Sequence, residues 1–150
     1  MDKHNLEKIT IANKNYRKVI RTTENMQLVL MSLDPGVEIG MESHPGRTQF
    51  FRVESGTAHA EVEGKRYVLK DGDSLIVHPD EQHNVWCSGR CDEPCKLYTI
   101  YSPPQHRDGT VHRTKEDDPG TEEDTESDES VTSGSRIFRI PEHLKRSRSL

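Results

Sequence analysis

Hydrophobic residues in this chain occur in short runs that are separated by glycine, proline and aspartate. The run Gln27–Leu33 is nearly continuous, which is typical of a strand buried on both faces. From Thr57 to Glu63 apolar and polar residues alternate, which is typical of a strand with one buried face, and Gly64–Lys65 then turns the chain. The pattern therefore predicts an all-β sandwich or barrel.

Further strands are expected wherever a short apolar run lies between turn residues. Residues 5–21 mix apolar and charged side chains without a helical stripe, so we expect an irregular or short β arm that packs on the body. No internal repeat is visible. The remaining expected strands are Glu38–His44, Gln49–Val53, Tyr67–Leu69, Ser74–Val77, Val85–Cys87 and Lys96–Tyr101.

The composition changes near residue 115, which divides the chain of 150 residues into one folded domain, 1–115, and a tail, 116–150. The domain contains 16 Lys+Arg and 16 Asp+Glu, whereas the tail contains 5 and 10, so the net charge of −5 arises in the tail. The tail is first acidic and then basic, and it is too poor in apolar residues to offset its chain entropy. We expect it to be disordered, with docking on the barrel or binding of a protein partner as alternatives.

The charge balance of the domain narrows the classes of partner. An electrically neutral body gives no argument for binding to nucleic acid or to a membrane surface. No apolar run approaches the roughly 18 residues that a membrane-spanning helix needs, and the polar N-terminus has no signal-peptide region. We therefore expect a soluble, cytoplasmic protein with a small-molecule substrate or ligand and with neither a nucleic-acid nor a membrane partner.

Three cysteines, Cys87, Cys91 and Cys95, are separated by three residues each. An odd number of cysteines and a reducing compartment argue against a disulfide framework. The spacing is not Cys-x2-Cys, so a structural zinc site is a weak alternative. We expect loop thiols beside a hairpin.

Four polar residues combine the donor groups that bind divalent transition metals. Glu42 and His44 are two residues apart in a strand-like segment, so both side chains leave the same face. Gln49 follows a Pro-Gly turn and can return on the neighbouring strand, and His83 precedes another apolar run. Two imidazoles, a carboxylate and an amide oxygen suit Fe, Mn, Zn, Ni or Co rather than Ca. Gln49 is the weakest donor and is either a ligand or an outer partner of the ligands.

The spacing of these residues resembles the first motif of the cupin superfamily. Glu42 stands where that family usually carries a histidine, and Gln49 stands at its acidic position. The motif reads Gly36-x5-Glu42-x-His44-x4-Gln49-x6-Gly56.

The second cupin motif is recognisable from Gly72–Asp73 to His83 but departs from the family pattern at three positions. His78, Asp80 and Cys87 stand where Pro, Gly and Asn are usual. His78 is either a fifth metal donor or a loop residue.

Two further segments, 27–33 and 97–112, are similar to small single-domain cupins described as mannose-6-phosphate-isomerase-like. The resemblance implies a double-stranded β-helix, that is, a jelly-roll barrel, with a metal held by Glu42, His44, Gln49 and His83. It also implies a homodimer. In that group the polar stretch after Pro103 passes the barrel mouth, so His106 or His112 could approach a ligand, although surface positions are the simpler interpretation.

Three functions are compatible with this resemblance, which places the first of them slightly ahead. The first is a sugar-phosphate isomerase or epimerase, for which Arg47, Arg52 and Arg66 are the only obvious phosphate-binding residues. The second is a non-haem Fe(II) oxygenase, because two histidines and one carboxylate leave metal positions open for oxygen and substrate. The third is a non-enzymatic cupin that binds a metal or small ligand and recruits a partner through its tail.

Overall fold

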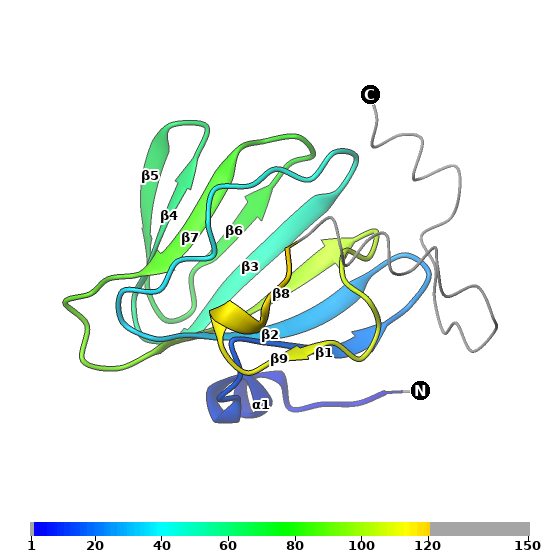
Figure 1. Ribbon diagram of the computed structural model, residues 1–150, viewed down its shortest axis with the longest axis horizontal. Coiled ribbons are helices and arrows are strands. Elements are labelled where there is room, and N and C mark those ends of the chain that lie inside the picture. The colour runs from blue at the N-terminus through cyan, green and yellow to red at the C-terminus, as the bar shows by residue number, and fades with distance from the viewer. Residues whose placement is uncertain (1, 121–150) are drawn as a thin grey trace.

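The structure is a computed structural model that describes residues 2–120. One α-helix, nine strands and one 3-10 helix follow one another in this part of the chain (Figure 1). They are α1 (Leu6–Ala12), β1 (Arg17–Thr22), β2 (Gln27–Leu33), β3 (Thr48–Ser55), β4 (Ala58–Val62), β5 (Lys65–Leu69), β6 (Ser74–Val77), β7 (His83–Cys87), β8 (Cys95–Ser102), β9 (Val111–His112) and η1 (Lys115–Asp117).

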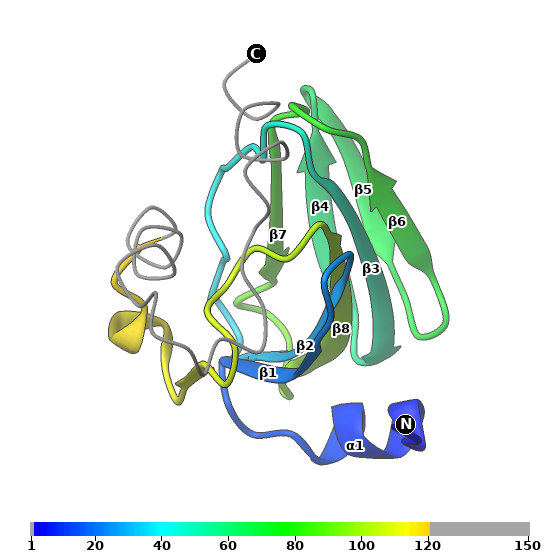
Figure 2. The ribbon, with the colours of Figure 1, turned by 90° about the vertical axis from the view of Figure 1, so that its right-hand side faces the viewer.

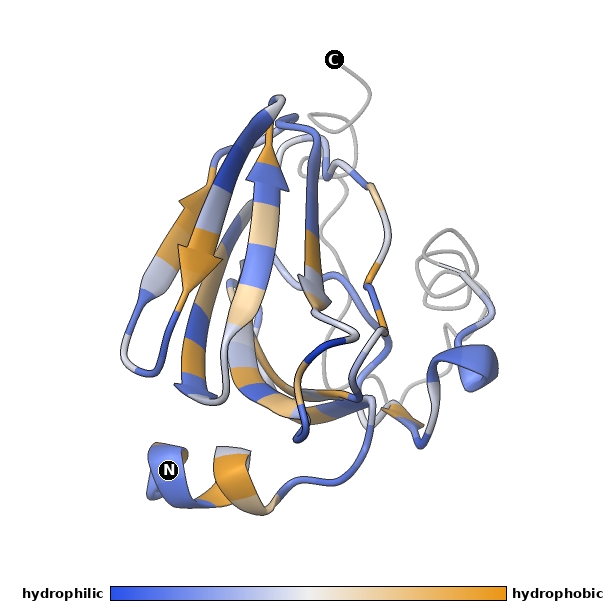
Figure 3. Ribbon diagram, turned by 90° about the vertical axis from the view of Figure 1, so that its left-hand side faces the viewer, coloured by the Kyte–Doolittle hydropathy of each residue, from blue (hydrophilic) through white to orange (hydrophobic). Residues whose placement is uncertain are grey.

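The strands form two antiparallel sheets that enclose one core (Figure 2). The larger sheet has the order β6-β3-β8-β2-β1-β9 and the smaller one the order β5-β4-β7. Hydrophobic and hydrophilic residues alternate along the strands (Figure 3), so each strand turns one row of side chains inward. The expected all-β jelly-roll architecture is confirmed.

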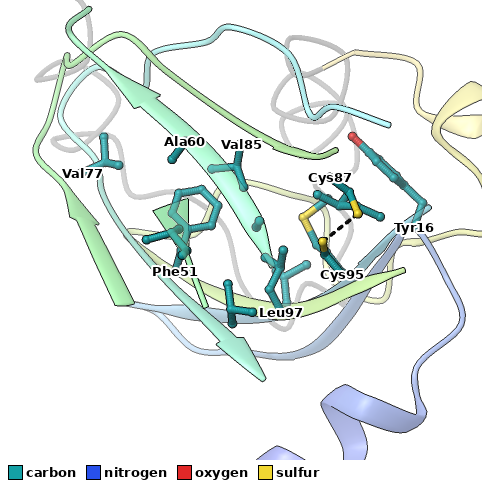
Figure 4. Close-up of a cluster of buried hydrophobic side chains, with 14 of the residues drawn as sticks. Tyr16, Phe51, Ala60, Val77, Val85, Cys87, Cys95 and Leu97 are labelled. Carbon is teal, nitrogen blue, oxygen red and sulfur yellow. Dashed lines mark hydrogen bonds between the residues drawn. The ribbon is translucent and has the colours of Figure 1, made fainter. Parts of the chain in front are cut away.

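The core contains side chains from both sheets, and removing this apolar surface from water stabilises their packing (Figure 4). Most core residues are aliphatic, with one phenylalanine and two buried thiols among them. Representative members are Val29, Met31, Leu33, Phe51, Val53, Ala58, Ala60, Val85, Cys87, Cys95 and Leu97.

The N-terminal arm differs from the sequence-based expectation. Residues Leu6–Ala12 form α1, whose N-terminus is capped by the Asn5 side chain, which accepts the Lys8 backbone N–H at 3.1 Å. Lys96 fixes the other end, because its Nζ donates to the Asn13 carbonyl at 2.6 Å. The prediction of an irregular or β arm is therefore wrong for the helix and correct only for β1. A helix this short depends on such tertiary contacts more than on its own sequence pattern.

The expected strand Glu38–His44 is also not a regular strand. This segment touches β7 through two isolated bridges, Glu38 to Trp86 and Glu42 to His83. Gly40 interrupts the ladder between them, because its φ of 110° lies in a region that favours glycine and its N–H donates to the Asn84 side chain at 2.8 Å.

The segment after β8 crosses back over the body and is held by two buried side chains. Gln27 donates to the His106 carbonyl at 2.7 Å and accepts the backbone N–H of the same residue at 2.9 Å. The Arg47 Nε donates to the carbonyls of Pro103 and Pro104, both at 3.0 Å. These contacts place residues 103–106 beside the barrel interior.

Residues 116–120, which the composition assigns to the tail, are part of the described structure. Asp118 forms an ion pair with the buried Arg17 at 2.6 Å. The acidic and basic stretches of the predicted disordered tail, 121–150, lie outside the described residues. Within residues 2–120, neither helix is long and apolar enough to cross a membrane.

Candidate metal centre

Two of the candidate ligands, Glu42 and His83, are brought together by backbone hydrogen bonds. The Glu42 N–H donates to the His83 carbonyl at 2.8 Å, and the His83 N–H donates to the Glu42 carbonyl at 2.9 Å. His83 is also the first residue of β7 and pairs with Val62 of β4 on its other side. The His83 backbone is therefore fixed in the smaller sheet, and the Glu42 backbone is fixed to that of His83.

Three ligand atoms from Glu42, His44 and His83 all lie within 4.8 Å of one another. The Glu42 Oε2 atom is 3.4 Å from His44 Nε2 and 3.8 Å from His83 Nε2. Both histidines are buried, whereas 20% of the Glu42 side chain is exposed. The cluster could hold one metal ion, with the carboxylate on the side nearer to solvent.

Gln49, the fourth residue singled out by the sequence, lies beside the same cluster. Its Oε1 atom is 3.0 Å from His83 Nε2, and its Nε2 donates to the Thr99 hydroxyl at 2.9 Å. Thr99 therefore orients the amide so that oxygen, rather than nitrogen, faces the imidazoles. The structure brings all four predicted residues together.

The histidine environments fit a bound metal. The His44 Nε2 atom is buried, faces the Glu42 Oε2 atom at 3.4 Å, and makes no well-aligned hydrogen bond within the described part of the chain. Both nitrogens of His83 face oxygen atoms, Nδ1 facing the Glu81 carbonyl at 2.9 Å and Nε2 facing Gln49. A neutral imidazole donates from only one nitrogen. A metal on Nε2 would leave Nδ1–H to donate to Glu81, which is the usual outer support of a metal-bound histidine.

Electrostatics also favour metal-binding protonation states. Burial disfavours the charged form of Glu42, but His44, His83 and Arg17 outweigh burial, so the pKa of this carboxyl lies below its usual value. Burial lowers the pKa of His83 despite the opposing contact with the Glu81 carbonyl. A carboxylate and a neutral imidazole are the forms that bind a metal.

Aromatic side chains that the motif does not include surround the cluster. Tyr101 packs edge-on against His44 with ring centres 5.6 Å apart, and Phe51 packs against His83 at 6.1 Å. The Tyr101 hydroxyl is 3.3 Å from His106 Nε2. The alternation of β8 could have indicated Tyr101, because this residue shares the inward face with Thr99.

The surface positions expected for His106 and His112 are wrong, because both side chains are buried. His106 belongs to the crossing segment that Gln27 anchors, and the Nδ1 of His112 lies 3.2 Å from Arg17 Nη1. Polar sequence around a residue does not show which loops fold over a barrel.

The second cupin motif departs from the usual sequence without disturbing the site. His78 is exposed on the loop before His83, so the loop alternative applies and a fifth donor does not. Asp80 has a φ of 73°, which explains why glycine is usual there and shows that aspartate tolerates the same conformation.

The three arginines do not converge on the metal cluster as a phosphate-binding group. Arg52 is 41% exposed and pairs with Glu54 at 3.3 Å. Arg66 is 77% exposed and pairs with Glu61 at 3.2 Å. Arg47 is buried and donates to the carbonyls of the crossing segment.

The cysteines are not simple loop thiols. Cys87 and Cys95 are fully buried in the core, and only Cys91 is partly exposed. The sequence placed Cys87 at the end of a strand correctly but did not show that the start of β8 faces it from the other sheet.

Two antiparallel sheets that enclose a cluster of two histidines and a carboxylate define a cupin-type barrel with a candidate metal centre. The chain belongs to the cupin family, because residues 29–101 match the family described as "Cupin domain" and two relatives that are at least 35% identical are matched over more than two thirds of their own length.

The relatives and solved structures that match support this membership. Uncharacterized protein YrkC of Bacillus subtilis (strain 168) is 37% identical over 119 residues, which cover 75% of this chain and 63% of YrkC. Uncharacterized protein L612 of Acanthamoeba polyphaga mimivirus is 40% identical over 111 residues, covering 71% of this chain and 68% of L612. The crystal structure of BH2720 from Bacillus halodurans shares 35% identity with a TM-score of 0.74, covering 77% of this chain and 91% of that one. This chain therefore spans just under two thirds of the length of YrkC.

Proposed function

We propose that this protein is a metal-dependent cupin in which Glu42, His44 and His83 hold one divalent transition metal. The observation that carries the proposal is the convergence of their three ligand atoms within 4.8 Å inside the barrel. Three protein ligands leave the remaining coordination positions of an octahedral metal to Gln49, water or a small molecule.

Among enzymatic roles, the donor set favours a non-haem Fe(II) oxygenase. Two imidazoles and one carboxylate are the set that leaves adjacent metal positions open for oxygen and substrate. Bound iron would supply the ability to activate oxygen next to a coordinated substrate. The chain itself supplies the surroundings, because Phe51 and Tyr101 pack against the two histidines and limit access of water.

A sugar-phosphate isomerase or epimerase of the mannose-6-phosphate-isomerase-like type is the second enzymatic candidate. It rests on sequence resemblance and would use the metal to polarise a carbonyl. The described arginines give it little support, because Arg52 and Arg66 form exposed ion pairs and Arg47 supports the crossing segment. A non-enzymatic cupin that binds a small chelating ligand is the third candidate.

Elemental analysis of the purified full chain tests the metal proposal. We expect about one equivalent of a transition metal per chain, removable by a chelator and restored by dialysis against the metal. The double variant His44→Ala/His83→Ala should lose this metal and keep a β-rich circular dichroism spectrum. His78→Ala is the matched control, because His78 is exposed on the neighbouring loop. Stoichiometric metal in the double variant would overturn the assignment.

Reconstitution with single metals distinguishes the activities. Oxygen uptake by the Fe(II)-loaded protein with a small bidentate acid would support the oxygenase, and the double variant should show none. Turnover of a hexose phosphate without oxygen would support the isomerase instead. Tight binding of a chelating ligand with neither reaction would support the non-enzymatic role.

A further inference from the structure

Three sulfur atoms gather at the end of the barrel away from the candidate metal centre. The Sγ atoms of Cys87 and Cys95 are 2.7 Å apart (Figure 4). The Cys95 thiol also lies 2.9 Å from the Thr57 carbonyl, and the same carbonyl is 3.9 Å from the sulfur of Cys91. Cys87 and Cys95 therefore lie next to each other, and Cys91 shares the Thr57 carbonyl with Cys95.

The two buried thiols come from different sheets. Cys87 is the last residue of β7 in the smaller sheet, and Cys95 is the first residue of β8 in the larger sheet. Gly56 packs so closely on this point that a Cβ atom there would lie 3.2 Å from the Cys95 Cα. The backbone around Cys95 is therefore held in place, and its side chain is directed across the core at Cys87.

We propose that Cys87 and Cys95 form a reversible disulfide that joins the two sheets, and that Cys91 receives the oxidising equivalent from a small disulfide. The separation of the buried sulfurs exceeds the S–S bond length of about 2.05 Å by only about 0.7 Å. A shared zinc ion fits this arrangement less well, because two thiolates on one tetrahedral zinc lie about 3.7 Å apart, about 1 Å farther than the two sulfurs.

The three thiols differ in exposure, and this difference determines which of them can react first with an oxidant. Cys87 and Cys95 have no exposed surface, whereas Cys91 is partly exposed on the loop between them. Burial raises the pKa of both inner thiols, so they remain protonated at neutral pH and react slowly with an oxidant in solution. Cys91 is the thiol that a small disulfide can reach.

The reaction balances through two thiol–disulfide exchanges. The Cys91 thiolate attacks the small disulfide, which forms a mixed disulfide on Cys91 and releases one small thiol. A buried thiol then loses its proton and attacks the Cys91 sulfur, which releases the second small thiol. Exchange with the remaining buried thiol restores the Cys91 thiol and leaves the Cys87–Cys95 bond. The net change oxidises two protein thiols and reduces one small disulfide.

The proposed bond is separate from the candidate metal centre. His83 and Cys87 are the two ends of β7, which places them about 13 Å apart along the strand. Metal content should therefore be the same in the oxidised and reduced protein, so this proposal and the proposed function succeed or fail independently.

Peptide mapping after oxidation tests the proposal on the full chain. Oxidised glutathione is the probe, free thiols are then alkylated, and trypsin cleaves after Arg90 and Lys96. This cleavage separates Cys87, in peptide 71–90, from Cys91 and Cys95, in peptide 91–96. We expect the two peptides to be linked, with the loss of two hydrogens, with Cys91 alkylated, and with full reversal by dithiothreitol.

Two variants assign the partners. Cys91→Ser should still form the link, but on the order of tenfold more slowly, because the accessible thiol is gone. Cys95→Ser should be unable to form the disulfide between positions 87 and 95. Its metal content should be unchanged. Stable glutathione on Cys91 with Cys87 and Cys95 still alkylated would overturn the proposal. A final bond that includes Cys91 in the unmodified sequence would overturn it as well, and neither result depends on how a variant folds.

Discussion

Glu42 and His83 face each other across a backbone bridge in which each N–H donates to the other residue's carbonyl, at 2.8 and 2.9 Å. The bridge places a carboxylate and an imidazole that are far apart in the sequence 3.8 Å from each other. Glu42 is nevertheless outside the regular strands. The segment meets β7 in two isolated bridges, one at Glu38 and one at Glu42.

Replacing Glu42 by glutamine should weaken metal binding strongly. The change keeps the shape of the side chain but removes the negative charge that lies nearest to both histidines. We expect a loss larger than the roughly 10–100-fold that changes around a metal ligand typically cause. Competition with a chromophoric chelator measures the affinity. Glu38→Gln is the control, because Glu38 is exposed on the same segment and should bind metal as the unmodified protein does.

Gln49→Glu should increase metal affinity if the Gln49 oxygen completes the coordination sphere. The change puts a carboxylate 3.0 Å from the His83 nitrogen, at the position where related barrels carry an acidic residue. The same chelator competition measures the affinity. Thr99→Val is a second variant for this measurement, because it removes the hydrogen bond that orients the Gln49 amide. Weaker binding by Gln49→Glu with an unchanged fold would show that Gln49 supports His83 without contacting the metal.

Asp118→Asn should destabilise the folded protein by about 1–3 kcal/mol at neutral pH, because it leaves the buried Arg17 guanidinium without its carboxylate. The Asp118 side chain is 19% exposed, so solvent screens part of the interaction. Urea denaturation measures the difference, and Glu116→Gln, an exposed change in the 3-10 helix that Asp118 caps, should have no effect.

The Asp118 contribution should also depend on pH in one direction. Burial alone would raise the pKa of this carboxyl, but Arg17 outweighs burial and holds the pKa below its usual value of 3.8. A lowered folded-state pKa means that the stabilisation is fully present above 3.8 and is lost as the pH falls through the lowered value. The stability difference between the unmodified chain and Asp118→Asn should therefore shrink only in strong acid. If this stability difference shrinks near neutral pH instead, a titratable group other than Asp118 is responsible for it.

Gln27→Leu should loosen the crossing segment and cost about 3 kcal/mol, because the buried backbone groups of Gln105 and His106 lose their partners. Trypsin should then cleave after Arg107 at lower concentrations than in the unmodified protein. Gln82→Leu is the matched control on an exposed position. Equal protease resistance in both variants would show that Arg47 alone holds the segment.

Short-range pattern was enough to predict most strands, whereas the four candidate site residues were grouped through the resemblance to a family motif. Ser74–Val77 and Gln27–Leu33 agree with β6 and β2, because alternation and turn residues mark their limits directly. Glu42, His44, Gln49 and His83 could be grouped because the family spacing encodes which strand each one occupies.

The features that sequence reasoning missed depend on contacts between distant segments. The α1 helix has no clear stripe and is fixed by Lys96, and the burial of His106 depends on Gln27, far along the chain. The meeting of Cys87 and Cys95 requires the relative placement of two sheets, which no local pattern contains.

The isolated bridge at Glu42 has a consequence for how this barrel changes over evolutionary time. The hydrogen-bond ladders of β7 and β8 hold His83 and Thr99 whether or not residue 42 carries a carboxylate. A change of the residue 42 side chain can therefore alter the donor set without breaking those ladders. That position is also where this chain carries glutamate in place of the histidine usual in related barrels. A single position outside the regular ladders thus lets descendants of one stable scaffold acquire, exchange or lose a metal ligand while the surrounding protein is inherited almost unchanged.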